Sequence, residues 1–370
     1  MSSKEVIVLG TTHHNTLGII RSLGESPYNF GVVLVLYGES ESYLTSSKYV
    51  KSHYFVKSPN EVTGQLLALA KEEKQVIIAT TDEAVHQLDL NAGLLLPYFH
   101  FFGTKEVGRL TWFSDKQEQD ITAQSIGLNT PTNYTPENIC YPCLLKPLAS
   151  IAGGKRVIIC NNKEEYHHAI SEFPKTQFQI QQYLPKEQEI VLVGLSVNGE
   201  VHIPAYILKQ RENAGGGTTY STVHPSNDLD SSLVEKSKEL VKVIGYEGLF
   251  GIEYLLCEGK YWFIEINLRS DATSYAVSVA GVNLPVAYVL AKQGEEINNI
   301  VNNQVCIIYS MVEFRDFEFV LKRKIGLLSW LRQRNQCKCL YFYSHSDREP
   351  YRINRRKLWR RIMSGLTNKI

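Results

Sequence analysis

The first eighty residues alternate short apolar runs with stretches of helical periodicity. Continuous apolar runs are typical of buried strands, whereas a period of 3.6 residues is typical of helices. The apolar runs are EVIVLG, GVVLVLY and QVIIATTD, and the helical stretches lie around Ile19–Leu23 and Leu66–Ala70. Strands that alternate with helices predict parallel βαβ units, so we expect an α/β, Rossmann-like domain at the N-terminus.

Parallel sheets of this kind bind ligands beyond the carboxyl ends of their strands. Here those positions are Gly10–Asn15, with the sequence GTTHHN, and Thr80–Glu83, with the sequence TTDE. GTTHHN lacks the second and third glycines that let a backbone approach a pyrophosphate, which argues against a dinucleotide-dependent oxidoreductase. His13 and His14 are either polar surface or contacts for a small ligand, and the sequence leaves both readings open.

A second unit begins near Pro131, after a helical region at 105–127. It reads as the strand CLLKPL, the loop ASIAGGKR, the strand VIICN, the helix KEEYHHAISEF and the strand QFQIQQYL. Two strands that flank a Gly-Gly-Lys loop predict a hairpin whose tip can fold over a ligand. Further along, EIVLVGLSVNGEVHIP predicts a hairpin that turns at Asn198–Gly199, while Asp230–Ile244 and Pro285–Lys292 predict amphipathic helices.

The stretch LFGIEYLLCEGKYWFIEIN reads as another hairpin, with its turn at Glu258–Lys260. If Gly259 is the centre of that turn, Glu253 pairs directly with Glu265, and side-chain alternation places Asn267 on the same face. Two glutamates in such a pair have Cβ atoms about 5 Å apart and repel each other. A positive group is therefore expected between them.

Oxygen ligands of this kind suit a hard divalent cation. Mg²⁺ is usually held by one or two carboxylates, and substrate phosphates complete its coordination. Glu253, Glu265 and Asn267 are therefore predicted to hold Mg²⁺ against phosphate, with Mn²⁺ as an alternative ion. The competing reading places one glutamate at a frayed strand end in solvent, and the apolar residues that flank both positions argue against it.

A cradle for phosphate is expected beside the metal. Lys146, on its predicted strand, and Lys155, in the Gly-Gly-Lys loop, are candidates. Backbone N–H groups of a small-residue loop can approach phosphate oxygens, and a lysine supplies a point charge. The competing reading is an ordinary surface turn with a lysine next to it.

The composition is that of an ordinary globular chain. Its 370 residues are 44% hydrophobic and 21% charged, with a formal net charge of +1, so disorder is not expected. Basic residues concentrate after Lys322, with a dense cluster between Arg355 and Arg361. This tail is either a solvated helix face or a contact for an anionic substrate, a membrane surface or nucleic acid.

The cysteines and the apolar runs bear on the compartment. Seven cysteines are an odd number, which fits free thiols better than a disulfide framework. Cys140 and Cys143 have the spacing of half a zinc site, but the chain offers no matching pair at a suitable distance. VIVLG is too short for a signal peptide and no run is long enough to span a membrane, so a cytoplasmic location is expected.

The order of these pieces resembles the ATP-grasp superfamily, and within it the carboxylate-amine ligases. The resemblance runs from about Val6 to Leu290 and rests on the Lys-Pro strand, the Gly-rich loop with lysine, QQYL followed by a glutamate, and the EINLR motif. It implies an N-terminal pre-ATP-grasp domain before two α+β subdomains that grip ATP. The implied boundaries are 1–108 for the N-terminal domain, 109–190 for the small subdomain, 191–310 for the large subdomain and 311–370 for a basic C-terminal extension.

The resemblance also implies a nucleotide site. The residues that match lysines at the nucleotide phosphates are Lys116 and Lys146, and those that match the mobile phosphate loop are Gly153, Gly154 and Lys155. The residues that match the adenine-binding hinge are Gln181, Gln182, Tyr183 and Leu184. Gln181 replaces the acidic residue that the family usually has there, and Glu189 matches the ribose-binding glutamate after an extra residue in the turn.

Metal and catalytic roles are implied in the same way. The family's metal-binding triplet is matched by Glu253, Glu265 and Asn267, in agreement with the hairpin. Arg269 matches the arginine that faces the transferred phosphate or the substrate carboxylate, although Leu268 replaces the usual proline. Lys209 and Arg211 resemble basic residues that reach the γ-phosphate and the acyl intermediate.

The implied activity is ATP-dependent carbon–nitrogen ligation through an acyl phosphate, with release of ADP and phosphate. The implied substrates are small, amino-acid-like carboxylates and amines. No nucleic acid is expected, a homodimer is compatible with the resemblance, and peripheral membrane contact through the basic tail is left open. The alternative is an inert ATP-binding scaffold or sensor of the same fold, and the complete metal triplet argues against it.

Overall fold

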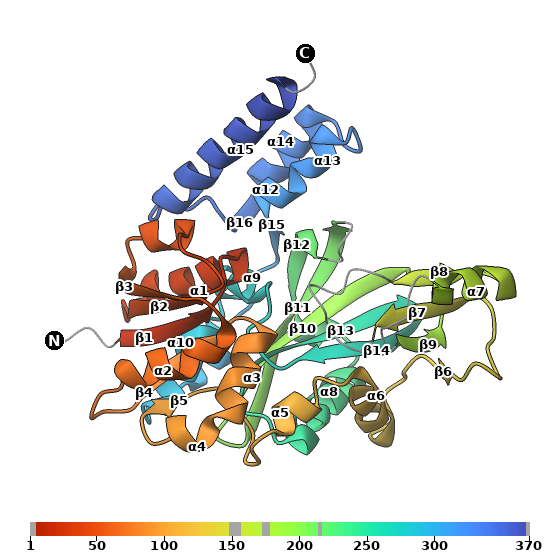
Figure 1. Cartoon of the computed structure of the whole chain (residues 1–370), viewed down its shortest axis with the longest axis horizontal. Coiled ribbons are helices and arrows are strands. Elements are labelled where there is room, and N and C mark those ends of the chain that lie inside the picture. The colour runs from red at the N-terminus through yellow and green to blue at the C-terminus, as the bar shows by residue number, and fades with distance from the viewer. Residues whose placement is uncertain (1–4, 148–156, 172–177, 214–216, 368–370) are drawn as a thin grey trace.

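The computed structural model describes residues 5–147, 157–171, 178–213 and 217–367, without the side chains of Pro147, Trp359 and residues 361–367. Within these residues the chain forms three β-sheets flanked by helices (Figure 1). The predicted phosphate loop, with Gly153, Gly154 and Lys155, lies outside the described residues.

The N-terminal sheet is parallel, with its five strands in the spatial order β3-β2-β1-β4-β5. The strands are β1 Glu5–Gly10, β2 Gly31–Tyr37, β3 Val50–Val56, β4 Gln75–Ala79 and β5 Phe99–His100. All of β2 and β4 is buried, which explains their uninterrupted apolar sequences and confirms the predicted βαβ arrangement. The sequence pattern does not reveal β3, because this edge strand exposes polar residues.

Helices from two distant parts of the sequence cover this sheet. The helices of the N-terminal region are α1 His14–Gly24, α2 Val62–Ala68, α3 Asp82–Leu90 and α4 Ala92–Leu95. Two later helices, α9 Ser274–Val279 and α10 Leu284–Lys292, pack against α1, and α10 also contacts strands of two different sheets (Figure 1). They join the N-terminal layer to the rest of the chain.

A small antiparallel sheet carries the segment before the phosphate loop. Its order is β6-β9-β7-β8, with β6 Asn133–Tyr134, β7 Cys143–Pro147, β8 Ile158–Cys160 and β9 Phe178–Gln182. Helix α7 Lys163–Ser171 packs on β8, and Tyr166 of α7 belongs to the small core beneath the sheet. Because β7 and β8 pair antiparallel, the hairpin predicted around the Gly-Gly-Lys loop is confirmed.

The third sheet has seven strands in the order β14-β13-β10-β11-β12-β15-β16. They are β10 Gln188–Val197, β11 Glu200–Glu212, β12 Thr218–Pro225, β13 Gly248–Cys257, β14 Lys260–Asn267, β15 Ile308–Met311 and β16 Cys337–Leu340. The β10–β11 hairpin turns at Asn198 and Gly199, whose φ values of 54° and 82° fit the two-residue turn expected from the sequence. β15 spans the predicted boundary after residue 310, so the C-terminal segment contributes to this sheet.

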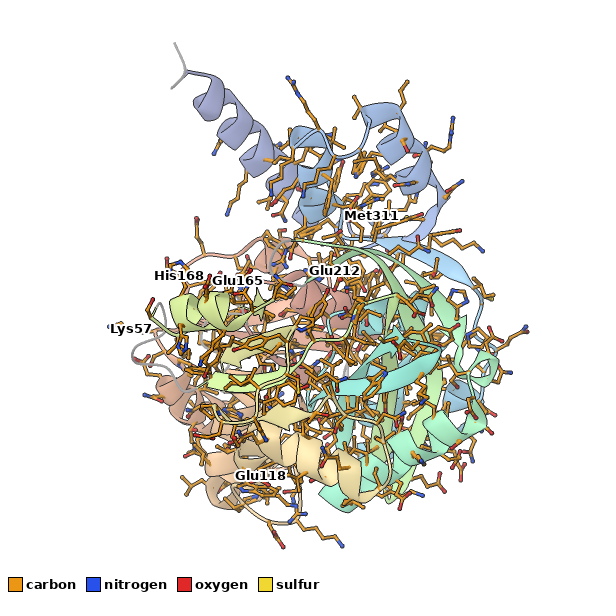
Figure 2. The ribbon with its side chains drawn as sticks, turned by 90° about the vertical axis from the view of Figure 1, so that its right-hand side faces the viewer. Lys57, Glu118, Glu165, His168, Glu212 and Met311 are labelled. Atoms are coloured by element: carbon orange, nitrogen blue, oxygen red, sulfur yellow. The ribbon has the colours of Figure 1, made fainter. Side chains whose placement is uncertain are left out.

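The remaining helices flank the large sheet or build the C-terminal lobe, which we define as residues 312–367. Beside the sheet lie α5 Arg109–Trp112, α6 Lys116–Ser125, α8 Ser231–Ile244 and α11 Asn298–Val301, and the lobe holds α12 Glu313–Asp316, α13 Glu318–Leu321, α14 Leu327–Gln336 and α15 Glu349–Thr367. Figure 2 shows Met311, at the end of β15, where the lobe joins the body. Among the described helices, none combines the length and apolar composition needed to cross a membrane.

A buried arginine fastens the C-terminal lobe to the N-terminal domain. Arg21 of α1 is fully buried and donates to the backbone carbonyls of Tyr341, Phe342 and Asp347 at 2.9 Å. Its Nε also lies 3.2 Å from the carboxylate of Asp347. Because a buried ion pair is costly to break, the lobe is held in place against α1.

Candidate active site

A cavity of about 860 Å³ lies where the N-terminal domain, the large sheet and the C-terminal lobe meet. The loop after β1 contributes His13 and His14 to its wall. The large sheet contributes Lys209, Glu253, Glu265, Asn267 and Arg269, and the C-terminal lobe contributes Arg315, Glu318, Lys322 and Tyr341. The cavity thus lies at the carboxyl end of β1, where ligands of parallel sheets are expected.

Glu253 and Glu265 are paired across β13 and β14, as predicted, but for a different reason. The turn is a two-residue one at Glu258 and Gly259, with φ values of 51° and 70°, and not a turn centred on Gly259. That shift alone would misalign the two glutamates. A bulge between Glu253 and Tyr254 restores the pairing, because it inserts one extra residue on β14.

Lysines from the small-subdomain side neutralise Glu265. Lys116, at the start of α6, places its Nζ 2.6 Å from a carboxylate oxygen of Glu265. Burial opposes the charge on Glu265, yet Lys116 and then Lys146 hold its pKa down to about 2. Lys146 is itself buried on β7, and burial together with Lys116 lowers its pKa to about 8. This corner therefore holds more positive charge than one carboxylate compensates, which suits an anionic ligand.

Glu253 has the opposite electrostatic character. Lys209 of β11 lies 2.8 Å from Glu253 and also contacts Glu189 of β10. Burial and the neighbouring charges of Glu265 and Glu189 outweigh the opposing charge of Lys209 and raise the pKa of Glu253 to about 7. The raised pKa shows that one lysine does not fully compensate the carboxylates here, so an added cation would be favourable.

Arg269 connects the N-terminal domain to the strand face that carries Glu253, Glu265 and Asn267, which we call the metal-triplet face. Its Nη2 donates to Oδ1 of Asn267 at 3.0 Å, and its Nε lies 2.9 Å from the carboxylate of Asp82. Asp82 begins α3, directly after β4, so the predicted ligand edge Thr80–Glu83 reaches the site. Asn267 also donates to Glu253 at 3.3 Å, which places the three triplet residues on one face.

The donor set fits Mg²⁺. Glu253, Glu265 and Asn267 offer two carboxylates and one amide oxygen that face the same cavity. No group of three or more His, Cys, Asp or Glu residues that could hold a metal occurs in the described part of the chain. Mg²⁺ is usually held by one or two carboxylates, and phosphate oxygens and water occupy its remaining positions.

The two histidines at the cavity wall are neutral. Burial, together with the charges of Arg315 and Arg269, lowers the pKa of His13 to about 3. Burial and His13 lower the pKa of His14 in the same direction. Neutral imidazoles add no charge to the cavity, so its positive character comes from lysine and arginine.

This burial predicts a pH dependence of stability. His13 has a lower pKa when folded than its ordinary value of 6.5, so unfolding takes up a proton between about pH 3 and 6.5. The free energy of unfolding therefore falls as the pH drops below 6.5, by about 1.4 kcal/mol per pH unit for this residue. Urea unfolding between pH 5 and 8 should show a shallower slope in His13→Gln. His53→Gln, at an exposed position of β3, should keep the wild-type slope, and equal slopes in all three proteins would contradict the burial of His13.

Comparison with known proteins agrees with this geometry. The sequence profile described as "ATP-grasp domain" matches residues 121–282, which include the small sheet, the metal-triplet hairpin and Arg269. The chain contains an ATP-grasp domain. The predicted resemblance is thereby confirmed, together with the predicted fold class of a Rossmann-like domain before the ATP-grasp fold.

Curated relatives of this ATP-grasp domain match only part of their own length. D-alanine–D-alanine ligase of Fusobacterium nucleatum is 30% identical over 172 residues, which are 43% of this chain and 57% of that one. The carbamoyl phosphate synthase large chain of Clostridium botulinum is 28% identical over 212 residues, which are 52% of this chain and 20% of that one. The chain thus spans little more than half of the first relative and a fifth of the second.

Solved structures extend the likeness beyond the ATP-grasp domain. N5-carboxyaminoimidazole synthetase from Staphylococcus aureus, solved with ADP, has a TM-score of 0.68 at 14% identity and covers 88% of this chain and 86% of that one. L-amino acid ligase from Bacillus licheniformis has a TM-score of 0.60 at 14% identity, over 82% and 76% of the two chains. At such identities the likeness shows the fold alone, over most of this chain.

The predicted hinge residues lie at the end of β9 and just after it, before the chain enters β10 of the large sheet. The side chain of Gln181 is buried and donates to Asp120 at 3.2 Å and Asn133 at 3.0 Å. Gln182 accepts from the backbone of Thr132, and the Leu184 side chain is buried. The Gln181 amide is thus committed to the small subdomain, and the backbone N–H groups of Gln182 and Tyr183 already donate to the carbonyls of Thr132 and Pro142.

Arg211 does not join the cluster that its predicted role requires. Its guanidinium makes two hydrogen bonds to the buried carboxylate of Asp316, at 2.8 and 2.7 Å, and a third to Gln333. It also lies over the ring of Tyr220. This bidentate pairing ties β11 to the C-terminal lobe, and among the described residues Arg211 does not line the cavity.

Several wall residues carry no signal in the sequence. Arg315 and Tyr341 come from the C-terminal lobe, to which no motif was assigned, and Asp271 follows the EINLR motif. GTTHHN did single out His13 and His14, and the structure places both at the cavity. Arg315 and Tyr341 reach this wall because the lobe packs on α1, which lies far away in the sequence.

Proposed function

We propose that this chain is an ATP-dependent carboxylate-amine ligase that forms an amide through an acyl phosphate. The observation that carries the proposal is the pairing of Glu253 with Glu265 at the cavity, with Lys116 and Lys209 at their outer sides. A carboxylate pair flanked by lysines suits a cation and phosphate together and has no evident role in a scaffold.

The reaction has two balanced steps. In the first, an oxygen of a substrate carboxylate attacks the γ-phosphorus of ATP, the bond to the bridging oxygen breaks, and ADP leaves. In the second, an amine nitrogen attacks the acyl carbon, phosphate departs with the electron pair of the C–O bond, and the nitrogen loses a proton. Phosphoryl transfer of this kind asks the protein mainly for positioning and charge neutralisation.

The residues of this chain divide that task. Lys116 and Lys146 would neutralise phosphate charge, while Glu253, Glu265 and Asn267 would hold Mg²⁺, which when bound screens the negative charges that must approach each other. Arg269, fixed between Asp82 and Asn267, would orient the attacking carboxylate. Phosphate-loop residues Gly153, Gly154 and Lys155 and the hinge residues Gln181 to Leu184, with Glu189, are proposed for the rest of the nucleotide.

Trapping with hydroxylamine tests the proposal without knowledge of the amine. The protein would be incubated with Mg-ATP, hydroxylamine and pools of amino acids, hydroxy acids and short peptides, and hydroxamate and ADP would be measured. We expect both products to form in equal amounts with at least one pool. ATP binding without hydroxamate from any pool would favour the alternative, an inert ATP-binding scaffold or sensor.

We also propose peripheral contact between the C-terminal lobe and an anionic membrane surface. Exposed leucines lie close in sequence to exposed basic residues on α13, α14 and the turn between them, and Leu328 is 81% exposed. The leucines are Leu321, Leu327, Leu328 and Leu331, and the basic residues are Lys322, Arg323, Lys324 and Arg332. Apolar and basic side chains on one short segment suit an interface of acyl chains and anionic headgroups.

Vesicle sedimentation tests this contact. The protein should sediment with phosphatidylcholine vesicles that contain 30% phosphatidylglycerol but not with pure phosphatidylcholine. The double variant Leu327→Ser, Leu328→Ser should bind about 10-fold more weakly. The matched pair Leu90→Ser, Leu94→Ser, exposed on α3 and α4, should bind like wild type, and equal binding to both vesicle types would contradict the proposal.

A further inference from the structure

Arg315 is a cation in the cavity wall for which the described residues offer no partner. It lies on α12 and is partly buried, and no described side chain or carbonyl accepts a hydrogen bond from its guanidinium. Burial lowers its pKa, while Tyr43 and Glu318 only partly oppose that effect. A partly buried arginine usually pairs with a carboxylate or another anion, so this site is incomplete as it stands.

The carboxylates nearby are already committed to other groups. Glu318, one helix further along, lies 3.0 Å from Lys322. Asp271 accepts from the backbone N–H and the hydroxyl of Thr273. Glu253 and Glu265 are paired with Lys209 and Lys116. Glu318 thus acts on Arg315 only through its charge, and among the described carboxylates of the wall none accepts a hydrogen bond from the Arg315 guanidinium.

A second observation points to a ligand at the same wall. His14 is 4% exposed, and its Nδ1 has no hydrogen-bond partner in the described structure. His13 beside it accepts from the backbone N–H of Asn15 through Nδ1, so the proton of this neutral imidazole lies on Nε2, which can donate. The wall therefore has hydrogen-bonding capacity that the protein itself does not use.

The position of Arg315 fits a substrate that also reaches the metal-triplet face. The charges of Arg315 and Arg269 both act on His13, so the histidine lies near both cations. Arg269 in turn contacts Asn267 of the triplet. Arg315 and the metal-triplet face line a single cavity of about 860 Å³. This volume is large enough for a small organic acid with two charged groups.

We infer that Arg315, with the N–H of His13 beside it, binds a second anionic group of a substrate, a carboxylate or a phosphate separate from the carboxylate that is activated. This inference rests on the proposed function, which assigns Mg²⁺ and the activated carboxylate to the other end of the cavity. It names the substrate class as a dianionic acid, and it gives the C-terminal lobe a role in substrate selection. The shared chemistry is a tetrahedral or planar oxyanion that a guanidinium can hold through two parallel hydrogen bonds.

Matched pairs of ligands test this inference by binding. Isothermal titration in the presence of Mg²⁺ and a non-hydrolysable ATP analogue would compare glutamate with glutamine, succinate with succinamate, and O-phosphoserine with serine. We expect at least one dianion to bind wild type about 10- to 100-fold more tightly than its partner. The carboxylate and phosphate pairs distinguish the two sources of the anion.

Variants assign the preference to Arg315. Arg315→Gln should lose the preference for the dianion. Arg315→Lys keeps the charge but not the paired N–H donors of the guanidinium, so it should keep part of the preference. Arg348→Gln removes the same charge from an exposed position of the lobe and should bind like wild type. The inference is overturned if no dianion binds wild type better than its partner, or if Arg315→Gln keeps the preference.

The outcome is separable from that of the proposed function. A preference that depends on Arg315, together with no hydroxamate from any pool, would retain the anion subsite and refute the ligase. Hydroxamate formation without such a preference would do the reverse.

Discussion

Replacing Glu265 with glutamine is expected to lower ATP-dependent hydroxamate formation by about 1,000-fold. Glutamine keeps the shape of the side chain but removes the charge that faces both the cavity and Lys116. The lysines hold the pKa of Glu265 down to about 2, so loss of its charge should cost some stability, and a melting curve would establish that the variant remains folded at the assay temperature.

The same variant has a readout that needs no substrate. In wild type, Mg²⁺ should strengthen ATP binding, measured by titration calorimetry with and without the ion. Glu265→Gln should lose most of that Mg²⁺ dependence, whereas Glu200→Gln, at an exposed position of the β10–β11 hairpin, should keep it. Unchanged turnover and unchanged Mg²⁺ dependence in Glu265→Gln would remove this residue from the metal site.

Replacing Lys209 with methionine is expected to lower the free energy of unfolding by about 3–5 kcal/mol at neutral pH. Lys209 is almost fully buried and contacts Glu189 and Glu253, with Glu212 at 3.6 Å. Methionine fills the space but leaves these carboxylates without their shared cation. Part of the loss should be recovered at pH 5, because protonation of Glu253 then removes one of the buried charges.

Lys186 offers a matched control for this variant. It contacts Glu189 and Glu212, but its side chain is 44% exposed. Lys186→Met should therefore lower the free energy of unfolding by less than about 1 kcal/mol. If both variants lose equal stability in urea, the special role assigned to Lys209 is wrong.

The N-terminal sheet could be predicted because burial on both faces leaves a clear trace in the sequence. β1, β2 and β4 are nearly wholly buried and read as continuous apolar runs. β3 and β5 lie at the edges of the sheet, where polar residues or short length conceal them. Edge strands are therefore the part of such a sheet that a single sequence reveals least.

The pairing of Glu253 with Glu265 shows how a correct strand pairing can follow from an incorrect local detail. The expected turn was off by half a residue, and an unforeseen bulge compensated for it. The sequence has no signal for that bulge. What made the prediction robust is chemical: two carboxylates and an amide in an otherwise apolar hairpin have few roles other than ligand binding.

Arg211 and Arg315 are the two residues whose surroundings depend most on the C-terminal lobe. Arg211 looked available for phosphate because its partner, Asp316, is 105 positions away in the sequence. Arg315 gave no signal because a single arginine between aromatic and acidic residues looks like surface. Both positions follow from the pairing of β15 with β12, which joins segments far apart in the sequence and which no local pattern reveals.

The most direct test of the central claim follows one oxygen atom. A carboxylate that supports hydroxamate formation would be labelled with ¹⁸O at both oxygens and incubated with the protein, Mg-ATP and an amine, and the released phosphate would be analysed by mass spectrometry. Attack of the carboxylate on the γ-phosphate predicts one ¹⁸O atom in each phosphate released. Phosphate without ¹⁸O, formed together with ADP, would show that water and not the carboxylate attacks, and would contradict the acyl-phosphate route.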